Sequence, residues 1–156
     1  MYDIVAGYPL YVYYIGLISQ FGLFPLLATF YSVSVFNMYF LTYLITDFAN
    51  DATLVDNIMI AHHVICIVFT IIFSHTRGDI WLITIGEIGS GSYNIYTLAN
   101  AYNNHVSTAY AFYIVVMTLS NIYCSIVVLR RDAMWYYKIP ALILICGRQH
   151  FLYHVS

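Results

Sequence analysis

The sequence predicts an all-α protein, a polytopic membrane bundle of five or six transmembrane helices. The 156-residue chain is 62% hydrophobic and only 8% charged, whereas charged residues make up about 25% of a typical soluble domain. From Ile4 to Thr46 it contains no Asp, Glu, Lys or Arg, which is room for two membrane crossings of about 20 residues each. The apolar segments are longer than barrel strands and do not alternate, so they favour helices.

The first two helices are expected at residues 8–24 and 26–46, on either side of Pro25. Proline removes a backbone donor and clashes with the preceding turn, so Pro25 either separates two helices or kinks one long tilted helix. No Lys or Arg precedes this region, and it has no convincing small-residue cleavage site. We therefore expect the first helix to stay in the mature protein rather than to be cleaved as a signal peptide.

The remaining helices are expected at residues 57–74, 80–102, 106–129 and 135–153. Short loops rich in Lys and Arg face the cytosol, so the loops after the third and fifth helices are assigned to one cytosolic end. The basic residues of these loops are Arg77, Arg130, Arg131 and Lys138. The loops at residues 47–56 and 103–105 are expected at the opposite end.

Composition also excludes several classes of protein. Cys66, Cys124 and Cys146 lie in apolar segments without paired spacing, which suggests neither a disulfide framework nor a zinc site. Five basic residues against seven acidic ones provide no basic surface for nucleic acid. No repeat of fixed period is present, so residues 1–156 are expected to form one domain.

Two adjacent histidines, His62 and His63, interrupt an apolar run, and ionisable side chains at membrane depth are candidates for functional sites. In a helix, His62, Cys66 and Thr70 form one line, and Asp56 nearly stacks with His63. An imidazole beside a carboxylate can act as a general base, or as a nucleophile that carries an acyl group. The alternative is that both rings only form interhelical hydrogen bonds.

Glu87 is the only glutamate in the chain, and Ser90 and Asn94 follow it on the same helical face. A carboxylate near the middle of a membrane costs about 3 kcal/mol, so Glu87 is expected to face the interior of the bundle. Glycines at positions 86, 89 and 91 leave this helix with little bulk, which predicts close helix packing or room for a substrate.

Two weaker polar groups lie further along the chain. Asn121 belongs to a set of polar side chains on the next helix, which predicts interhelical hydrogen bonds. His150 and His154 are four residues apart, a spacing that places two imidazoles on one helical face as in a metal clip. No Glu or further His accompanies them locally, so we expect no metal site.

The polar motifs of residues 47–94 together resemble the TLC-domain family, which includes ceramide synthases, translocation-associated membrane proteins and lipid-regulating relatives. Asp47 at the end of an aromatic-rich helix, then Asp56, then MIAHHVICIVF at 59–69 resemble the family's acidic residue, spacer and double-histidine helix. EIGSGSYN at 87–94 resembles the following helix, where an acidic residue, small hydroxylated residues and an asparagine occur at the same offsets.

The resemblance implies a lipid site in which His62, His63, Asp56 and Glu87 are the catalytic candidates. We expect a substrate to contact six further residues: Asp47, Cys66, Thr70, Ser90, Asn94 and Asn121.

Three departures from the family favour broad membership over ceramide synthase activity. Cys66 stands where ceramide synthases usually have threonine, Glu87 stands alone where they have two acidic residues, and Tyr96 replaces a basic residue. The chain is also shorter than the usual family domain.

The first hypothesis is therefore a multi-pass protein of lipid metabolism or lipid homeostasis, in the endoplasmic reticulum or a related endomembrane of a eukaryotic host. It would bind membrane lipid or an acyl chain in a polar intramembrane pocket, without a cofactor. The second is an N-acyltransferase that takes its acyl group from acyl-CoA. The third is a metal-dependent lipid hydroxylase that uses His62, His63, His150 and His154, although such enzymes need more histidines than the six present.

Overall fold

The computed structural model describes residues 4–5, 8–52 and 57–154, and this part of the chain is almost entirely helical, which confirms the all-α prediction. The first rod runs without a break through α1 (Leu10–Leu17), the π-helix η1 (Ile18–Leu23) and α2 (Phe24–Phe30). The other rods are α3 (Val33–Ala52), α4 (Asn57–Phe73), α5 (Arg77–Ala101), α6 (Val106–Arg130) and α7 (Trp135–His154).

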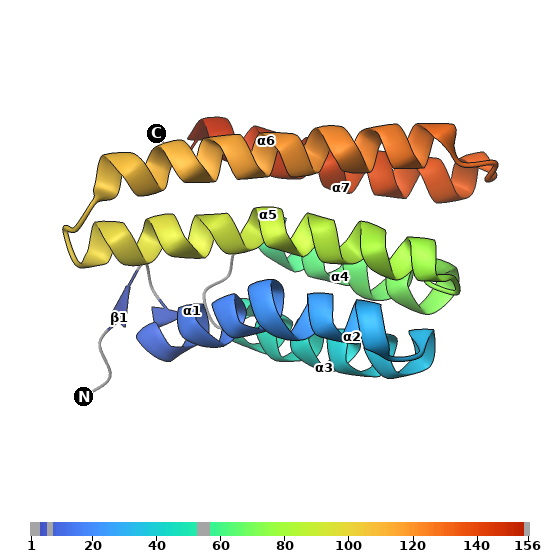
Figure 1. The fold of residues 1–156 in the computed structure, drawn as a ribbon, viewed down its shortest axis with the longest axis horizontal. Helices are drawn as coiled ribbons and strands as arrows, with labels where there is room; N and C mark the ends of the chain where they lie inside the picture. Colours follow the sequence, from blue (N-terminus) through green and yellow to red (C-terminus); the bar gives the residue numbers. More distant parts are fainter. Residues whose placement is uncertain (1–3, 6–7, 53–56, 155–156) are drawn as a thin grey trace.

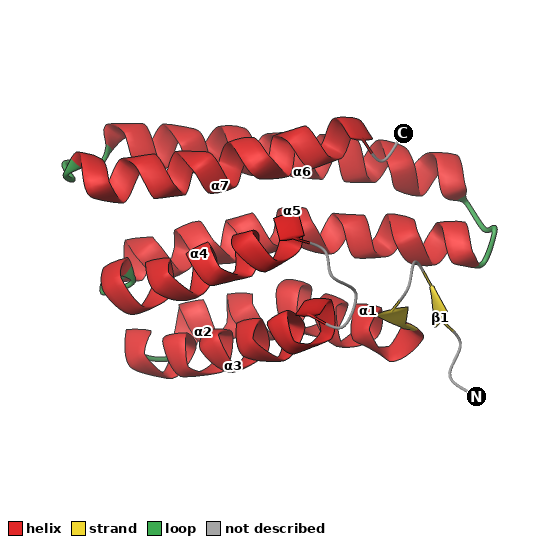
Figure 2. Ribbon diagram, turned by 180° about the vertical axis from the view of Figure 1, so that it is seen from behind, coloured by secondary structure: helices red, strands yellow, loops and turns green. Residues whose placement is uncertain are grey.

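The rods form three stacked layers of two (Figure 1). One row contains the first rod, α5 and α6, and the other row contains α3, α4 and α7, which are nearest the viewer in Figure 2. Consecutive rods run in opposite directions, and α5 contacts both the first rod and α6. A short antiparallel pair, β1 (Ile4–Val5) and β2 (Tyr8–Pro9), precedes α1.

The predicted bounds of the last four helices agree with the structure to within three residues. The predicted break at Pro25 is wrong, because the backbone stays helical through Pro25 and turns at Tyr31 and Ser32 instead. The alternative of one long helix is right that the helix continues through Pro25, but it is wrong in length, because the chain turns at Tyr31 and Ser32.

The π-helix explains how proline fits inside the first rod. The N–H of Phe24 donates to the carbonyl of Ser19, five residues earlier, as in π-helical geometry. Proline has no N–H to donate, and its ring crowds the preceding turn of an α-helix. The widened turn before Pro25 accommodates the ring, and it also turns Ser19 and Gln20 into the interior, where both are buried.

The predicted basic loops meet at one end of the bundle, as expected from the sequence (Figure 1). Arg77, at the start of α5, donates to the carbonyl of Ala28 at 3.1 Å and to that of Thr29 at 3.2 Å, which ties it to the end of α2. Arg131, at the end of α6, donates to the hydroxyl of Thr76 at 3.0 Å. The loop before α5 is therefore joined to both α2 and α6.

Asp79 is the centre of this end of the bundle and is 1% exposed. Its carboxylate accepts hydrogen bonds from the backbone and hydroxyl of Thr76 at 2.8 and 2.6 Å, which completes a capping box at the start of α5. It also accepts a hydrogen bond from Arg131, which forms an ion pair with it. Burial alone lowers the pKa of Arg131. The hydrogen bond to Asp79 and the nearby Tyr137 and Asp79 groups outweigh this effect, so the pKa of Arg131 is raised above its usual value.

The interior of the bundle is unusually polar and its exterior unusually apolar. Buried polar side chains include those of Gln20, His63, Thr70, Ser92 and Asn121. Large apolar side chains on the outside include those of Ile18, Phe30, Ile71, Leu119 and Ile143. In the described residues, the rods Leu10–Phe30 and Val106–Arg130 are long and apolar enough to cross a membrane, and two shorter apolar stretches lie at Val33–Ala49 and Ile60–Phe73.

Replacement of Asp79 by alanine is expected to lower the free energy of unfolding by about 3 kcal/mol, because it leaves a partly buried guanidinium without its counter-charge and removes the cap of α5. Thermal unfolding of the purified protein in detergent would measure this. The control is Asp132→Ala, which removes an exposed aspartate from the next loop. Equal melting temperatures for the two variants would contradict the role given to Asp79.

Candidate functional site

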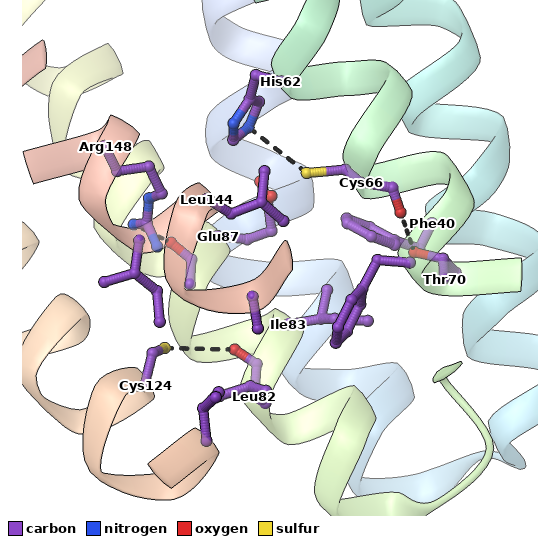
Figure 3. Close-up of a pocket in the computed structure, with 15 residues that line it drawn as sticks. Phe40, His62, Cys66, Thr70, Leu82, Ile83, Glu87, Cys124, Leu144 and Arg148 are labelled. Carbon is purple, nitrogen blue, oxygen red and sulfur yellow. Dashed lines mark hydrogen bonds between the residues drawn. The ribbon is translucent and has the colours of Figure 1, made fainter. Parts of the chain in front are cut away.

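A cavity of about 80 Å³ lies between α3, α4, α5, α6 and α7 and is partly open. Its volume exceeds by several-fold the roughly 10–15 Å³ that one water molecule needs. Most of the lining is apolar, contributed by residues such as Phe69, Leu82, Val128 and Leu144. The ionisable side chains on the wall include His62, Glu87 and Arg148, and these three lie toward one end of the cavity in Figure 3, away from Leu82 and Cys124.

Glu87 is held by a network of neutral amides. The Nε2 of Gln20 donates to Oε2 of Glu87 at 3.0 Å and to the hydroxyl of Tyr43 at 3.1 Å. The Oε1 of the same glutamine accepts from Nδ2 of Asn94 at 2.9 Å. Both amide hydrogens and the carbonyl of Gln20 are therefore used, so its side chain has one orientation and joins η1, α3 and α5 around the carboxylate.

Arg148 enters the cavity from α7. Its Nη2 donates to the carbonyl of Gly86 at 2.5 Å, to the hydroxyl of Ser120 at 3.2 Å and to the sulfur of Met117 at 3.2 Å. All three acceptors are neutral, and no ion pair within 4.0 Å joins Arg148 to Glu87, although both are described and face the same cavity. The opposite charges are thus separated by the space between them.

His62, Cys66 and Thr70 lie along one face of α4 and all three line the cavity, as their spacing predicts. The Sγ of Cys66 is 3.6 Å from Nε2 of His62. The hydroxyl of Thr70 donates to the carbonyl of Cys66 at 2.8 Å, so it serves the backbone of its own helix (Figure 3). Of this line, the imidazole is the group that has both a hydrogen-bond donor and an acceptor nitrogen when neutral.

His63 has a different environment from its neighbour. It is 4% exposed and does not line the cavity. Its Nε2 is 3.6 Å from Oδ2 of Asp47 on α3, and the two imidazole rings are 5.5 Å apart between centroids, nearly perpendicular. The histidine pair is therefore divided: His62 faces the cavity, and His63 joins α3 to α4 through a carboxylate.

Three other predicted site residues do not line the cavity: Ser90, Asn94 and Asn121. Ser90 is half-buried, Asn94 bonds to Gln20, and Asn121 donates to Oε1 of Gln149 at 2.8 Å. Asp56 lies outside the described residues.

The described part of the chain contains no group of three His, Cys, Asp or Glu side chains that could hold a metal ion. The side chains of His150 and His154 are not among those described. The hydroxylase hypothesis therefore gains no support from the described residues.

Sequence reasoning missed Gln20 and Arg148, the two residues that organise the polar end of the cavity. Each has a simple signal in the sequence: Gln20 is an amide within the long uncharged stretch, and Arg148 is a cation inside the last apolar helix. Either is costly in an apolar setting without polar partners. Attention to polar residues within apolar helices, rather than to motifs alone, would have found both.

The predicted packing role of the glycines is borne out at two positions. A side chain at Gly89 would collide with Arg148 and Ser120, and one at Gly91 would be 2.6 Å from the ring of Phe21. The missing side chain at Gly89 thus leaves the space in which the guanidinium lies, between α5 and α6.

Comparison with models of protein families, with curated proteins and with solved structures found no match.

Substitution of Gly89 by alanine is expected to displace the guanidinium of Arg148 and to destabilise the fold, because overpacking of an interior costs about 1–3 kcal/mol. The matched control is Gly147→Ala, beside Arg148 on α7, where an added methyl group meets nothing within 4 Å. That variant is expected to be neutral or more stable by up to about 1 kcal/mol. Melting temperatures in detergent would compare them, and an unchanged value for Gly89→Ala would contradict the packing described.

Proposed function

We propose that this chain is a multi-pass membrane protein that binds a lipid or an acyl chain in the central cavity, in lipid metabolism or lipid homeostasis. The observation that carries the proposal is the division of the cavity into a polar end, with His62, Glu87 and Arg148, and an apolar remainder. An amphiphile has the same division. A mostly apolar pocket with a few polar groups that fix orientation is typical of small-molecule sites.

The distribution of polar and apolar side chains supports the membrane part of the proposal. Buried polar residues and hydrogen bonds between helices are the means by which helices associate in lipid, since burial of apolar surface gives little advantage there. Exposed side chains such as Phe30 at 74%, Ile18 at 69% and Leu119 at 60% would be a liability in water. In a bilayer they face acyl chains.

The position of the polar end supports a buried headgroup. At 1.5 Å per residue, Glu87 is about 15 Å from the start of α5 at Arg77, and Arg148 is about 20 Å from the start of α7 at Trp135. The hydrocarbon core of a bilayer is about 30 Å thick. A ligand held by these side chains would therefore place its polar group well inside the bundle, with its alkyl part directed toward the end that carries the basic loops.

An acyl-CoA-dependent N-acyltransferase of the TLC-domain kind is the second candidate, and one observation favours it. His62 faces the cavity while Glu87 lines the same space, so a base and a carboxylate are available to one substrate. His63 and Asp47 would then act through the helix rather than on the substrate. Formation of an amide from labelled palmitoyl-CoA and a long-chain amine by the purified protein, and its loss in His62→Ala, would test this candidate.

Six membrane crossings predict that the two ends of the bundle are exposed on opposite sides of the membrane. Single cysteines at positions 75 and 132, in a chain whose three native cysteines are replaced by alanine, are expected to react with an impermeant maleimide from one side of sealed vesicles. A cysteine at position 104 is expected to react only from the other side. Labelling of all three from the same side would exclude this topology.

Filling the cavity is expected to remove bound lipid. Ala141 lines the cavity and is 5% exposed, whereas Ile143 on the same helix is 55% exposed and lies outside it. Ala141→Phe is therefore expected to reduce co-purified lipid several-fold relative to Ile143→Phe, as measured by mass spectrometry of lipid extracts. Melting temperatures identify a loss that is due to unfolding, and equal lipid content in two folded variants would contradict the proposal.

A further inference from the structure

The guanidinium of Arg148 has hydrogen-bonding capacity that the protein does not use. The hydrogen bonds that it makes to described residues are all donated by Nη2. Its Nε is buried and has no hydrogen-bond partner among the described residues. A buried donor without an acceptor costs about 1–3 kcal/mol, so an oxygen from a ligand would be stabilising at this position.

The charge of Arg148 is also incompletely balanced. A guanidinium remains protonated in proteins, whereas a carboxyl group can take up a proton. Among the described residues, the hydrogen-bond partners of the guanidinium are a carbonyl, a hydroxyl and a thioether, all of them neutral. Glu87 faces it across the cavity but is held by the amide of Gln20 and forms no ion pair with it within 4.0 Å.

A second unused hydrogen-bonding group lies near Arg148 but outside the lining of the cavity. The hydroxyl of Tyr113 is buried without a partner in the described part of the chain. Tyr113 packs against Met117, which contacts Arg148, and it is close enough to interact electrostatically with the guanidinium. The guanidinium of Arg148 lines the cavity and is charged, and hydrogen bonds from a charged donor are strongest to ionised oxygens such as those of a carboxylate or a phosphate.

We propose that the occupant of the cavity is an anionic amphiphile, a long alkyl chain that ends in a carboxylate or a phosphate, and that Arg148 binds its anionic oxygens. This inference rests on the lipid-binding function proposed above and specifies the chemical class of the ligand. The alkyl chain lies along the apolar lining formed by residues such as Phe69, Leu82 and Val128. Guanidinium groups suit this task because their planar donors match carboxylate and phosphate geometry.

Glu87 sets the strength of this site, because it is the negative charge described on the same cavity wall. In its ionised form it repels an incoming anion and attracts Arg148. In its protonated form it can donate a hydrogen bond to the same oxygens. The proposal therefore predicts opposite effects for the removal of the two charges.

The experiment is competition for a photoactivatable alkyl probe, a diazirine-bearing hexadecanol, bound to the full chain in nanodiscs. Unlabelled palmitate, hexadecyl phosphate and hexadecanol are the competitors, with equal chain length and different head groups. Palmitate or hexadecyl phosphate is expected to compete at least tenfold more strongly than hexadecanol, and the stronger of the two identifies carboxylate or phosphate as the preferred group. Equal competition by all three would overturn the proposal and leave lipid binding intact, whereas failure of the probe to label the protein at all would count against lipid binding itself.

Variants supply an independent readout. Arg148→Gln is expected to abolish the preference for the anions, and Glu87→Gln is expected to strengthen binding of palmitate several-fold. Arg130→Gln, at an exposed position outside the cavity, is the matched control and should retain the preference of the original chain. If Arg148→Gln fails to fold, the proposal is still tested by the competition of the three head groups in the original chain and by whether Glu87→Gln strengthens or weakens the binding of palmitate. Unchanged selectivity in a folded Arg148→Gln protein would overturn the role of Arg148.

Discussion

The side-chain amide of Gln20 is the interaction on which the centre of this bundle depends. It donates to Glu87 and Tyr43 and accepts from Asn94, so one neutral group fixes three helices around a carboxylate. An amide does this without adding charge, which suits an interior where each further ion must be balanced. The orientation of Glu87 toward the cavity follows from this arrangement.

The polar end of the cavity and the Asp79 network stabilise different parts of the same bundle. Asp79 and Arg131 hold the loops together at one end, where an ion pair has neighbouring hydrogen-bond donors and is partly open to solvent. Around the cavity, by contrast, Glu87 and Arg148 are kept apart by neutral groups. Charges paired at the end of the bundle support the fold, while charges separated inside it leave room for a ligand.

Much of the fold could be predicted from the sequence, because long apolar segments and polar loops define helices at the level of composition. The helices of residues 57–154 follow these signals closely. The turn at Tyr31 and Ser32 has no such signal, and Pro25 misled the prediction since a π-helix absorbs it. No local sequence pattern predicts the π-helical turn, because its formation depends on packing against other helices.

The candidate site was predictable in part. The line of His62, Cys66 and Thr70 follows from helical spacing, and all three residues reach the cavity. The sequence could not predict which of the two histidines lines the cavity and which contacts Asp47. Neighbours in a helix point about 100° apart, and the packing of α3 against α4 determines which of the two imidazoles lies near Asp47. Arg148 lies on α7, 61 residues after Glu87 in the sequence, a separation that no local motif spans.

The π-helix also determines which changes in chain length the first rod can accept. An i→i+5 turn contains about one residue more than an α-helical turn, so the segment Ile18–Leu23 takes up one additional residue with little rotation of the helix on its N-terminal side. Deletion of one residue there would restore ordinary helix and leave the preceding segment on nearly the same face. Deletion of one residue within α1 would instead rotate the residues before it by about 100°, so that a different face would meet α5. Register, more than hydrophobicity, is what this part of the sequence has to preserve.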